Sequence, residues 1–461
     1  MKKILETIRI ALSGEEKNFT SGSINRAIVL LSIPMILEMV MESLFAIVDV
    51  YFVGKVSTEA VATVGLTESV ITIIYSLAMG LAMASTAMIS RRIGENKPEE
   101  AASAAMQAIL MAVIVSIILG ILGFIYAESI LRMLGGSDHL IESGLWYTKI
   151  LLGTNIVITL LFVLNAVFRG AGDASIAMRT LWIANGLNIL LDPLFIFGIG
   201  FFPELGVAGA AVATTIGRSV GVSYQCYMLW KGTGVIRILK RHFVIVWATI
   251  IKLGDVALTG AWQWIVASAS WIFLMKIIAE FGDSVIAGYT ISIRILIFTI
   301  LPSWGMANAA ATLVGQNLGA NLPGRAEKSV WRTSWLNTFF LGSIGIFLFI
   351  FSQEVVSIFT SDVLAIETGV LSLRVFCIGY VFFAPAMVIS QAFNGAGDTR
   401  TPLYINFFCF WLTEIPLAYF LAKTINWGPS GVFWAIAIAE ALMGIILIVM
   451  FKRGKWKTME I

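Results

Sequence analysis

Long apolar stretches separated by short polar segments recur along the whole chain. Each stretch is long enough to form a helix that crosses a bilayer, which requires about 20 residues. We therefore predict an all-α membrane protein with twelve transmembrane helices. The predicted spans are 27–53, 60–89, 100–125, 141–168, 175–199, 206–230, 246–279, 284–315, 327–352, 363–392, 401–423 and 429–451. Several exceed the length that the membrane requires, so tilted or kinked helices are expected.

The composition argues against several other classes of protein. Of 461 residues, 58% are hydrophobic and 13% are charged, whereas a soluble domain carries about 25% charged residues. A net charge of +3 gives no indication of a nucleic-acid partner. The three cysteines lie in apolar stretches without the spacing of metal ligands, and the two histidines form no cluster. We therefore expect no enzymatic activity and no cofactor.

Basic residues mark every second loop and predict the orientation. They follow the even-numbered spans, namely Arg91, Arg92, Lys97, Arg169, Arg179, Lys231, Arg237, Lys240, Arg241, Arg325, Lys328, Arg400, Lys452, Arg453, Lys455 and Lys457. The other loops are richer in acidic residues. By the positive-inside rule, both termini are expected in the cytoplasm, with the protein in the plasma or inner membrane of the cell.

The first 26 residues are predicted to form a cytoplasmic segment. They are charged and polar and lack the small-residue site at which a signal peptide is cleaved. Apolar side chains at helical spacing predict a short helix that lies on the membrane surface. Its apolar residues are Ile4, Leu5, Ile8 and Leu12, and its basic residues are Lys2, Lys3 and Arg9.

Two short motifs occur twice and indicate an internal repeat. Gly170-Ala171-Gly172-Asp173 recurs as Gly395-Ala396-Gly397-Asp398, and Gly94 and Pro98 recur as Gly319 and Pro323. The differences 395 − 170 and 319 − 94 both equal 225. We predict two parallel lobes of six helices, 27–231 and 246–452, joined by a cytoplasmic linker, 232–245, and followed by a tail, 453–461. Secondary transporters commonly use this plan and place the substrate site between the repeats.

Three carboxylates interrupt the first predicted span. At ~100° per residue, Glu42 lies ~40° and Asp49 ~20° from Glu38, so all three share one narrow helix face. Charged side chains inside a membrane face protein or water rather than lipid. Pro34 lacks a backbone donor and is predicted to act as a hinge near the start of this helix.

A second set of polar groups lies in the fifth and sixth predicted spans. Combined with Asp49, the predicted pocket contains Asn188, Asp192, Thr214 and the carbonyl group of Ala210. Two neighbouring carboxylates favour the uptake of a proton. The same oxygen ligands also suit Na⁺ at Asp49, Asn188, Asp192 and Thr214, because hard cations prefer oxygen. The alternative is a polar network that only joins helices.

Further polar and aromatic residues are candidates for the lining of a cavity between the lobes. They are Glu38, Glu42, Gln263, Trp264 and Tyr380. Aromatic rings attract cations, and methionines adapt to bulky ligands. Both glutamates either contact a bound cation or pair with a basic residue such as Arg218. No nucleotide-binding loop is present, so transport would depend on an ion gradient.

Four motifs together resemble those of one family. They are Pro34 with Ile47-Val48-Asp49-Val50-Tyr51-Phe52-Val53-Gly54, Arg169-Gly170-Ala171-Gly172-Asp173, Asn188-Ile189-Leu190-Leu191-Asp192-Pro193, and Gly206-Val207-Ala208-Gly209-Ala210-Ala211 before Thr214. On these motifs, the chain resembles the multidrug and toxic compound extrusion (MATE) transporters over essentially its whole length. The resemblance implies a V-shaped protein of twelve helices whose two lobes alternate access.

The resemblance also implies site residues and a function. The amino-lobe cation site of the family corresponds to Asp49, Asn188, Asp192, Ala210 and Thr214, and its first helix bends near Pro34. We expect an antiporter that exports amphipathic organic compounds in exchange for H⁺ or Na⁺. We expect it to be a monomer among membrane lipids.

One departure from the family pattern favours a particular branch. The NorM branch has acidic cation ligands on spans seven and ten, whereas this chain has Gln263 in span seven and no acid near the centre of span ten. This favours the DinF-like branch, with ion coupling confined to the amino-terminal lobe. The alternative function is a flippase for lipids or lipid-linked saccharides, against which the acidic face of the first span argues.

Overall fold

A computed structural model describes residues 2–15, 19–232 and 234–461. Within these residues the chain is helical and contains no β-strand. A membrane-spanning segment must satisfy its backbone hydrogen-bonding groups internally, and a helix does so within one segment. The prediction of an all-α protein is confirmed.

The first part of the chain forms a short helix and six spans. The helices are α1 (Lys2–Ser13), α2 (Ile24–Gly54), α3 (Thr58–Gly94), α4 (Pro98–Met133), α5 (Asp138–Gly153), α6 (Asn155–Ala171), α7 (Ala174–Phe197) and α8 (Val207–Lys231). The predicted interfacial helix coincides with α1. The side chains of Lys2, Lys3, Ile4 and Leu5, on which that prediction partly depends, lie outside the described residues.

The second part begins with a linker that contains the 3₁₀ turn η1 (Lys240–Phe243). It continues with α9 (Trp247–Ala279), α10 (Asp283–Gly319), α11 (Pro323–Ile350), α12 (Ser352–Ser357), α13 (Val363–Ala396), α14 (Arg400–Asn406), η2 (Phe407–Glu414), α15 (Ile415–Tyr419), η3 (Phe420–Thr424), α16 (Pro429–Lys452) and η4 (Lys455–Thr458). The elements from α14 to η3 form one continuous span, in which η2 and η3 are π-helical.

The twelve predicted spans correspond to these helices within a few residues. Ten helices in the described chain are long and apolar enough to cross a membrane by themselves. The bent pair of α5 and α6 makes an eleventh candidate and corresponds to the predicted fourth span. The predicted sixth span corresponds to α8, which has 25 residues.

The fourth span differs from the single helix that we predicted for 141–168. α5 and α6 are bent by 42° at Thr154. The side chain of Asn155 donates to the carbonyl of Leu152 at 2.6 Å and to that of Ser116 on α4 at 3.1 Å. The side chain of Asn155 therefore connects the break in the fourth span to α4.

The internal repeat is visible in the backbone conformation. Asn96 and Asn321 adopt φ values of 58° and 57°, and Gly172 and Gly397 adopt 90° and 89°. These left-handed values suit Gly and are tolerated by Asn. Residues separated by 225 positions thus make the same turns in both halves.

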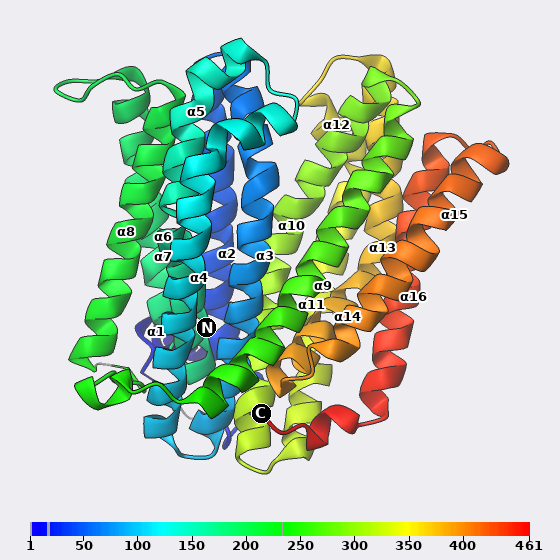
Figure 1. The fold of residues 1–461 in the computed structure, drawn as a ribbon. Coiled ribbons are helices and arrows are strands. Elements are labelled where there is room, and N and C mark those ends of the chain that lie inside the picture. The colour runs from blue at the N-terminus through cyan, green and yellow to red at the C-terminus, as the bar shows by residue number, and fades with distance from the viewer. Residues whose placement is uncertain (1, 16–18, 233) are drawn as a thin grey trace.

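The two halves form two lobes, with α2 to α8 in one and α9 to α16 in the other (Figure 1). They meet where α2 and α3 pack against α9 and α10. Both chain termini lie at one end of the bundle, which we call the terminal end, and the lobes diverge toward the opposite end, the far end.

Close packing holds the lobes together at the terminal end. A Cβ atom added to Gly94 would lie 2.0 Å from the carbonyl oxygen of Gln316, and one added to Gly319 would lie 2.1 Å from that of Arg91. The side chain of Gln316 donates to the carbonyl of Gly170 at 3.2 Å. In the part of the chain that the structure describes, every hydrogen bond between the lobes lies at this end. The molecule is therefore closed at the terminal end.

Candidate functional site

A cleft between the lobes contains the intramembrane charges. Its inner part is lined by Glu38, Arg169 and Met83, among others. A second part extends past Asp49 and Glu68. The two parts share the lining residues Glu42, Met79, Phe162, Arg218 and Trp264. The two parts therefore form one cleft, and concave sites lined by apolar side chains with a few polar groups are typical of small-molecule binding.

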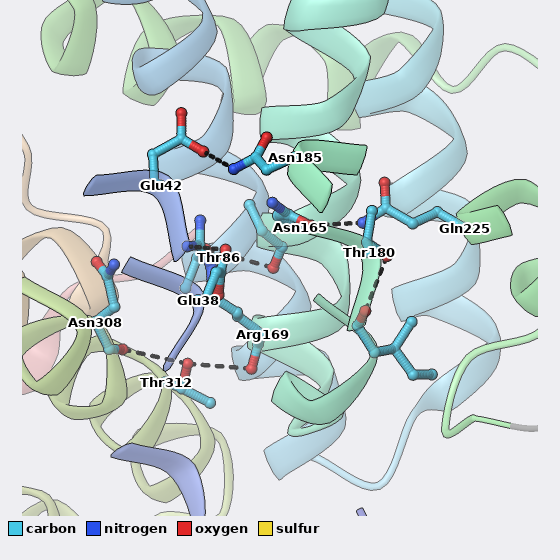
Figure 2. A network of polar contacts seen from close by, with 12 residues as sticks. Glu38, Glu42, Thr86, Asn165, Arg169, Thr180, Asn185, Gln225, Asn308 and Thr312 are labelled. Atoms are coloured by element: carbon cyan, nitrogen blue, oxygen red, sulfur yellow. Dashed lines mark hydrogen bonds and ion pairs between the residues drawn. The ribbon is translucent and has the colours of Figure 1, made fainter. Parts of the chain in front are cut away.

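Glu38 forms a buried ion pair at the base of the cleft. Its side chain is almost fully buried, and Arg169 Nη1 lies 3.2 Å from its Oε1. Arg169 comes from the last turn of α6, and its own backbone carbonyl accepts a hydrogen bond from Thr312 of the other lobe (Figure 2). Oε2 of Glu38 is buried without a hydrogen-bond partner. The pair therefore leaves one acceptor available beside the cavity.

Glu42, one helical turn further along α2, has two partners. Asn185 of α7 donates to its Oε2 at 2.8 Å (Figure 2), and Arg218 Nη2 lies 3.7 Å from its Oε1. Arg218 also donates to the hydroxyl of Tyr75 at 3.3 Å and stacks over the ring of Phe45. The charge of each glutamate is thus balanced by an arginine from the same lobe.

Asn188, Asp192 and Thr214 lie together between α7 and α8. Asn188 Nδ2 donates to Asp192 Oδ1 at 3.2 Å and to Thr214 Oγ1 at 3.1 Å. The first contact follows from helix geometry, because residues four apart are neighbours on one face. Asp192 is fully buried.

Asp49 approaches this group from α2. Its charge is close enough to interact with that of Asp192. Three buried oxygen atoms of this group have no hydrogen-bond partner, namely Asp49 Oδ1, Asn188 Oδ1 and Asp192 Oδ2. Unpartnered oxygen atoms of this kind are suited to a proton or a hard monovalent cation. In the described residues, no group of three or more His, Cys, Asp or Glu side chains is arranged to hold a metal ion.

Comparison with known proteins identifies the family of the chain. The MatE family model matches residues 34–194 and 256–420. The chain belongs to the MatE family. It is 29% identical to the probable multidrug resistance protein NorM of Thermotoga maritima, over 94% of this chain and 93% of that protein. It is 27% identical to the FAD transporter of Shewanella oneidensis, over 92% of this chain and 94% of that protein.

Solved structures give the same result for the fold. The structure of a multidrug resistance MATE family transporter in an outward-facing conformation matches with a TM-score of 0.88 at 27% identity, over 94% of this chain and 96% of that one. A MOP superfamily transporter from Pyrococcus furiosus matches with a TM-score of 0.89 at 27% identity, over 95% and 98% of the two chains. That structure is described as having a binding pocket of reverse polarity that suggests a different function. The twelve-helix, two-lobe MATE fold is confirmed.

The other predicted site residues of this MatE protein have distinct surroundings. Trp264 lines both parts of the cleft and contacts Trp304 with ring centroids 5.3 Å apart. Tyr380 is buried beside Leu341 and Ala384, and its hydroxyl lies 2.6 Å from that of Thr299. Tyr380 is not among the residues that line either part of the cleft. Its role as a cavity contact stays a prediction.

Gln263 is buried inside the second lobe and is not among the residues that line the cleft. It donates to Asn394 Oδ1 at 3.0 Å and to the carbonyl of Thr399 at 2.7 Å. Gln263 and Asn394 are the repeat counterparts of Glu38 and Arg169, since 263 − 38 and 394 − 169 both equal 225. The same position thus carries an ion pair in one lobe of the MatE protein and a neutral amide pair in the other.

Ala210 and Pro34 are both buried in helices of the first lobe. Ala210 lies one turn before Thr214 on α8, in an apolar cluster that also contains Val53 and Ile196. Pro34 lies inside α2, which continues through it from Ile24 to Gly54. The helix is therefore unbroken at the predicted hinge in this conformation.

Arg169 is the site residue that sequence reasoning missed. The sequence places it in a basic loop after the fourth predicted span and in a family motif, but predicts no role for its side chain in the site. The structure places its guanidinium group inside the lobe, where it is 8% exposed. Its place in the Arg169-Gly170-Ala171-Gly172-Asp173 motif was a signal, but its partner Glu38 is 131 residues away.

Proposed function

We propose that this MatE protein exports amphipathic organic cations across the cell membrane in exchange for H⁺ or Na⁺. The cleft between the lobes, which combines carboxylates with methionines and aromatic rings, carries the proposal. Such a lining suits bulky cations through adaptable packing and attraction to aromatic rings. The names of relatives as multidrug resistance proteins support the same function.

The proposed orientation places both termini in the cytoplasm. Basic residues concentrate in the loops of the terminal end, which agrees with the positive-inside rule. We assign the amino-terminal lobe to 27–231 and the carboxy-terminal lobe to 246–452. With this orientation, the cleft faces away from the cytoplasm, as in a state that releases substrate.

The proposed coupling site comprises Asp49, Asn188, Asp192, Ala210 and Thr214. A proton or Na⁺ bound there would neutralise carboxylates that otherwise repel each other. The resulting change in the contact of α2 with α7 would bend α2 at Pro34 and reduce the cleft. A ligand shifts such an equilibrium only through its different affinity for the two states. Substrate and coupling ion would therefore compete, because each would favour a different conformation of the first lobe.

The decisive test is efflux of a cationic dye from proteoliposomes under an imposed pH gradient and, separately, a Na⁺ gradient. We expect dye efflux from the wild type with at least one gradient, and its loss in Asp49→Asn. Asp283→Asn, which changes an exposed aspartate at the far end, is the matched control and should retain efflux. Normal efflux by Asp49→Asn would contradict the proposed coupling site.

One observation supports a second candidate, the translocation of anionic or lipid-linked substrates. The sequence predicted an acidic cavity face, but Arg169 and Arg218 balance Glu38 and Glu42. The argument against anionic headgroups is therefore weaker than the sequence indicated. If no gradient drives dye efflux while the same vesicles scramble a labelled lipid, the flippase function replaces the antiporter.

A further inference from the structure

The carboxy-terminal lobe contains its own pair of acidic side chains, of which one is buried and the other is partly buried. Glu414 ends the π-helical segment η2, and Glu440 lies on α16, which packs against both η2 and α15. Glu414 is 3% exposed, and the Oε2 atom of each glutamate is buried without a hydrogen-bond partner. The two carboxyl groups are close enough for their charges to interact. They belong to the eleventh and twelfth spans, in the lobe opposite Asp49 and Asp192.

Among the residues that the structure describes, two basic side chains on neighbouring elements have other partners. Lys423 of η3 pairs with Glu280 at 2.5 Å. Arg374 of α13 donates to the hydroxyl of Ser352 at 2.8 Å. The charges of the glutamates instead act on uncharged neighbours, namely Cys409 of η2 and, for Glu414, Tyr289 of α10. No cation among the described residues therefore balances Glu414 or Glu440.

Tyr289 of α10 has a buried hydroxyl group without a hydrogen-bond partner near Glu414. The residue is 1% exposed, and its hydroxyl is buried without a hydrogen-bond partner. It is close enough to Glu414 for the two groups to interact electrostatically. Its ring stacks on that of Phe433 of α16, with centroids 5.9 Å apart and planes at 5°. The packing therefore fixes the position of a polar group that has no structural partner.

The local helix geometry is unusual at the same place. Pro416 cannot donate a backbone hydrogen bond to the residue four positions earlier, and the chain forms the π-segment Phe407–Glu414 immediately before it. The hydroxyl of Thr413 donates to the carbonyl of Phe408 at 3.2 Å, five residues earlier. Single π-helical turns inside α-helices frequently occur at functional sites.

Ionisation of both glutamates in this environment would be costly. Each buried charge without a partner costs several kcal/mol, and two like charges add repulsion. One proton removes most of this cost, because the protonated carboxyl group can then donate to its neighbour. Ala418, one turn after Glu414, and Ala437, one turn before Glu440, belong to an apolar cluster.

We propose that Glu414 and Glu440 together bind a proton inside the carboxy-terminal lobe, with the hydroxyl of Tyr289 as a third polar contact. This departs from the sequence-based prediction, in which ion coupling is confined to the amino-terminal lobe. Its role in transport rests on the proposed antiport function. The proton site itself does not depend on that function.

Infrared spectroscopy of the full-length protein in lipid vesicles tests the site directly. The carbonyl stretch of a protonated carboxyl group is separate from the bands of a carboxylate and shifts in D₂O. We expect this band at neutral pH in the difference between the wild type and the double variant Glu414→Gln and Glu440→Gln. Glu367→Gln, which changes an exposed carboxylate of α13 in the same lobe, should give no such band.

Two results would overturn the inference. One is a difference spectrum that contains only carboxylate bands, which would mean that both glutamates are ionised. The other is a protonated band that disappears when Na⁺ replaces a bulky organic cation in the buffer, which would indicate a sodium site. The single variants serve if the double variant does not elute as a homogeneous protein, because each should change the same band.

The outcome can be separated from that of the proposed function. If dye efflux is absent but the protonated band is present, the proton site stands and the antiport function fails. If gradient-driven efflux occurs and the band is absent, the antiport function stands and the second proton site fails.

Discussion

At the scale of single residues, the two lobes differ in the side chains at one pair of positions that the internal repeat relates. Glu38 and Arg169 form a buried ion pair, whereas their counterparts Gln263 and Asn394 form a neutral hydrogen bond. An ion pair inside a protein loses much of its attraction to desolvation, but the removal of one partner is strongly destabilising. Loss of either Glu38 or Arg169 would therefore destabilise the protein. The ion pair lines the cleft, where transport would make use of its charge.

This comparison predicts the effect of a pair of substitutions. We expect Arg169→Asn to destabilise the protein by about 3–5 kcal/mol, because it leaves Glu38 buried without its cation. Adding Glu38→Gln should restore most of that loss, because the double variant reproduces the pair of the second lobe. Thermal unfolding of purified protein in detergent measures both changes. A double variant as unstable as Arg169→Asn alone would contradict the explanation.

At the scale of elements, α10 packs directly on the backbone of α2 beside the predicted hinge. A Cβ atom added to Gly305 would lie 2.5 Å from the carbonyl oxygen of Met35, the residue after Pro34. The close approach requires glycine at this point of the interface. In this conformation α10 therefore lies against α2 next to Pro34, where α2 is unbroken.

We therefore expect Gly305→Ala to separate α10 from α2 and to destabilise this conformation by about 1–3 kcal/mol, the usual cost of overpacking. The control is Gly342→Ala on α11, where an added Cβ atom meets nothing within 4 Å. Because alanine favours helices over glycine, that variant should be as stable as the wild type or slightly more so. Equal midpoints of thermal unfolding for the two variants would show that the contact at Gly305 is not close in solution.

At the scale of the whole molecule, the terminal end acts as the closure between the lobes. Arg91 of α3 donates to the carbonyl of Ala396 at the end of α13 and to that of Met459 in the tail, at 3.3 and 3.0 Å. Arg92 donates to the carbonyl of Ile461 at 3.3 Å. The tail of the second lobe thus contacts the first lobe, and an opening at this end must break these bonds.

Removal of this connection should loosen the terminal end. We expect Arg91→Gln to increase hydrogen–deuterium exchange at the end of α3, at the end of α13 and in the tail. Arg132→Gln is the matched control, because Arg132 pairs only with Glu128 and Asp138 of its own lobe at the far end. Unchanged exchange at the terminal end in Arg91→Gln would mean that the other contacts there keep the lobes closed without Arg91.

The sequence by itself determined the number and approximate limits of the spans, the repeat at 225 residues, and the acidic face of α2. These follow from local hydrophobicity and from helix periodicity, which act within one segment. The contact of Asn188 with Asp192 was predictable for the same reason, since both lie on one helix.

Only the tertiary structure decided which distant groups meet. The pairing of Glu38 with Arg169 and the approach of Glu440 to Glu414 join different helices, so no periodicity within one segment reveals them. The bend at Thr154 and the π-segment before Pro416 likewise depend on neighbours that accept or replace backbone hydrogen bonds. In a membrane, hydrophobicity selects the helices, but packing between them determines where each polar group finds a partner.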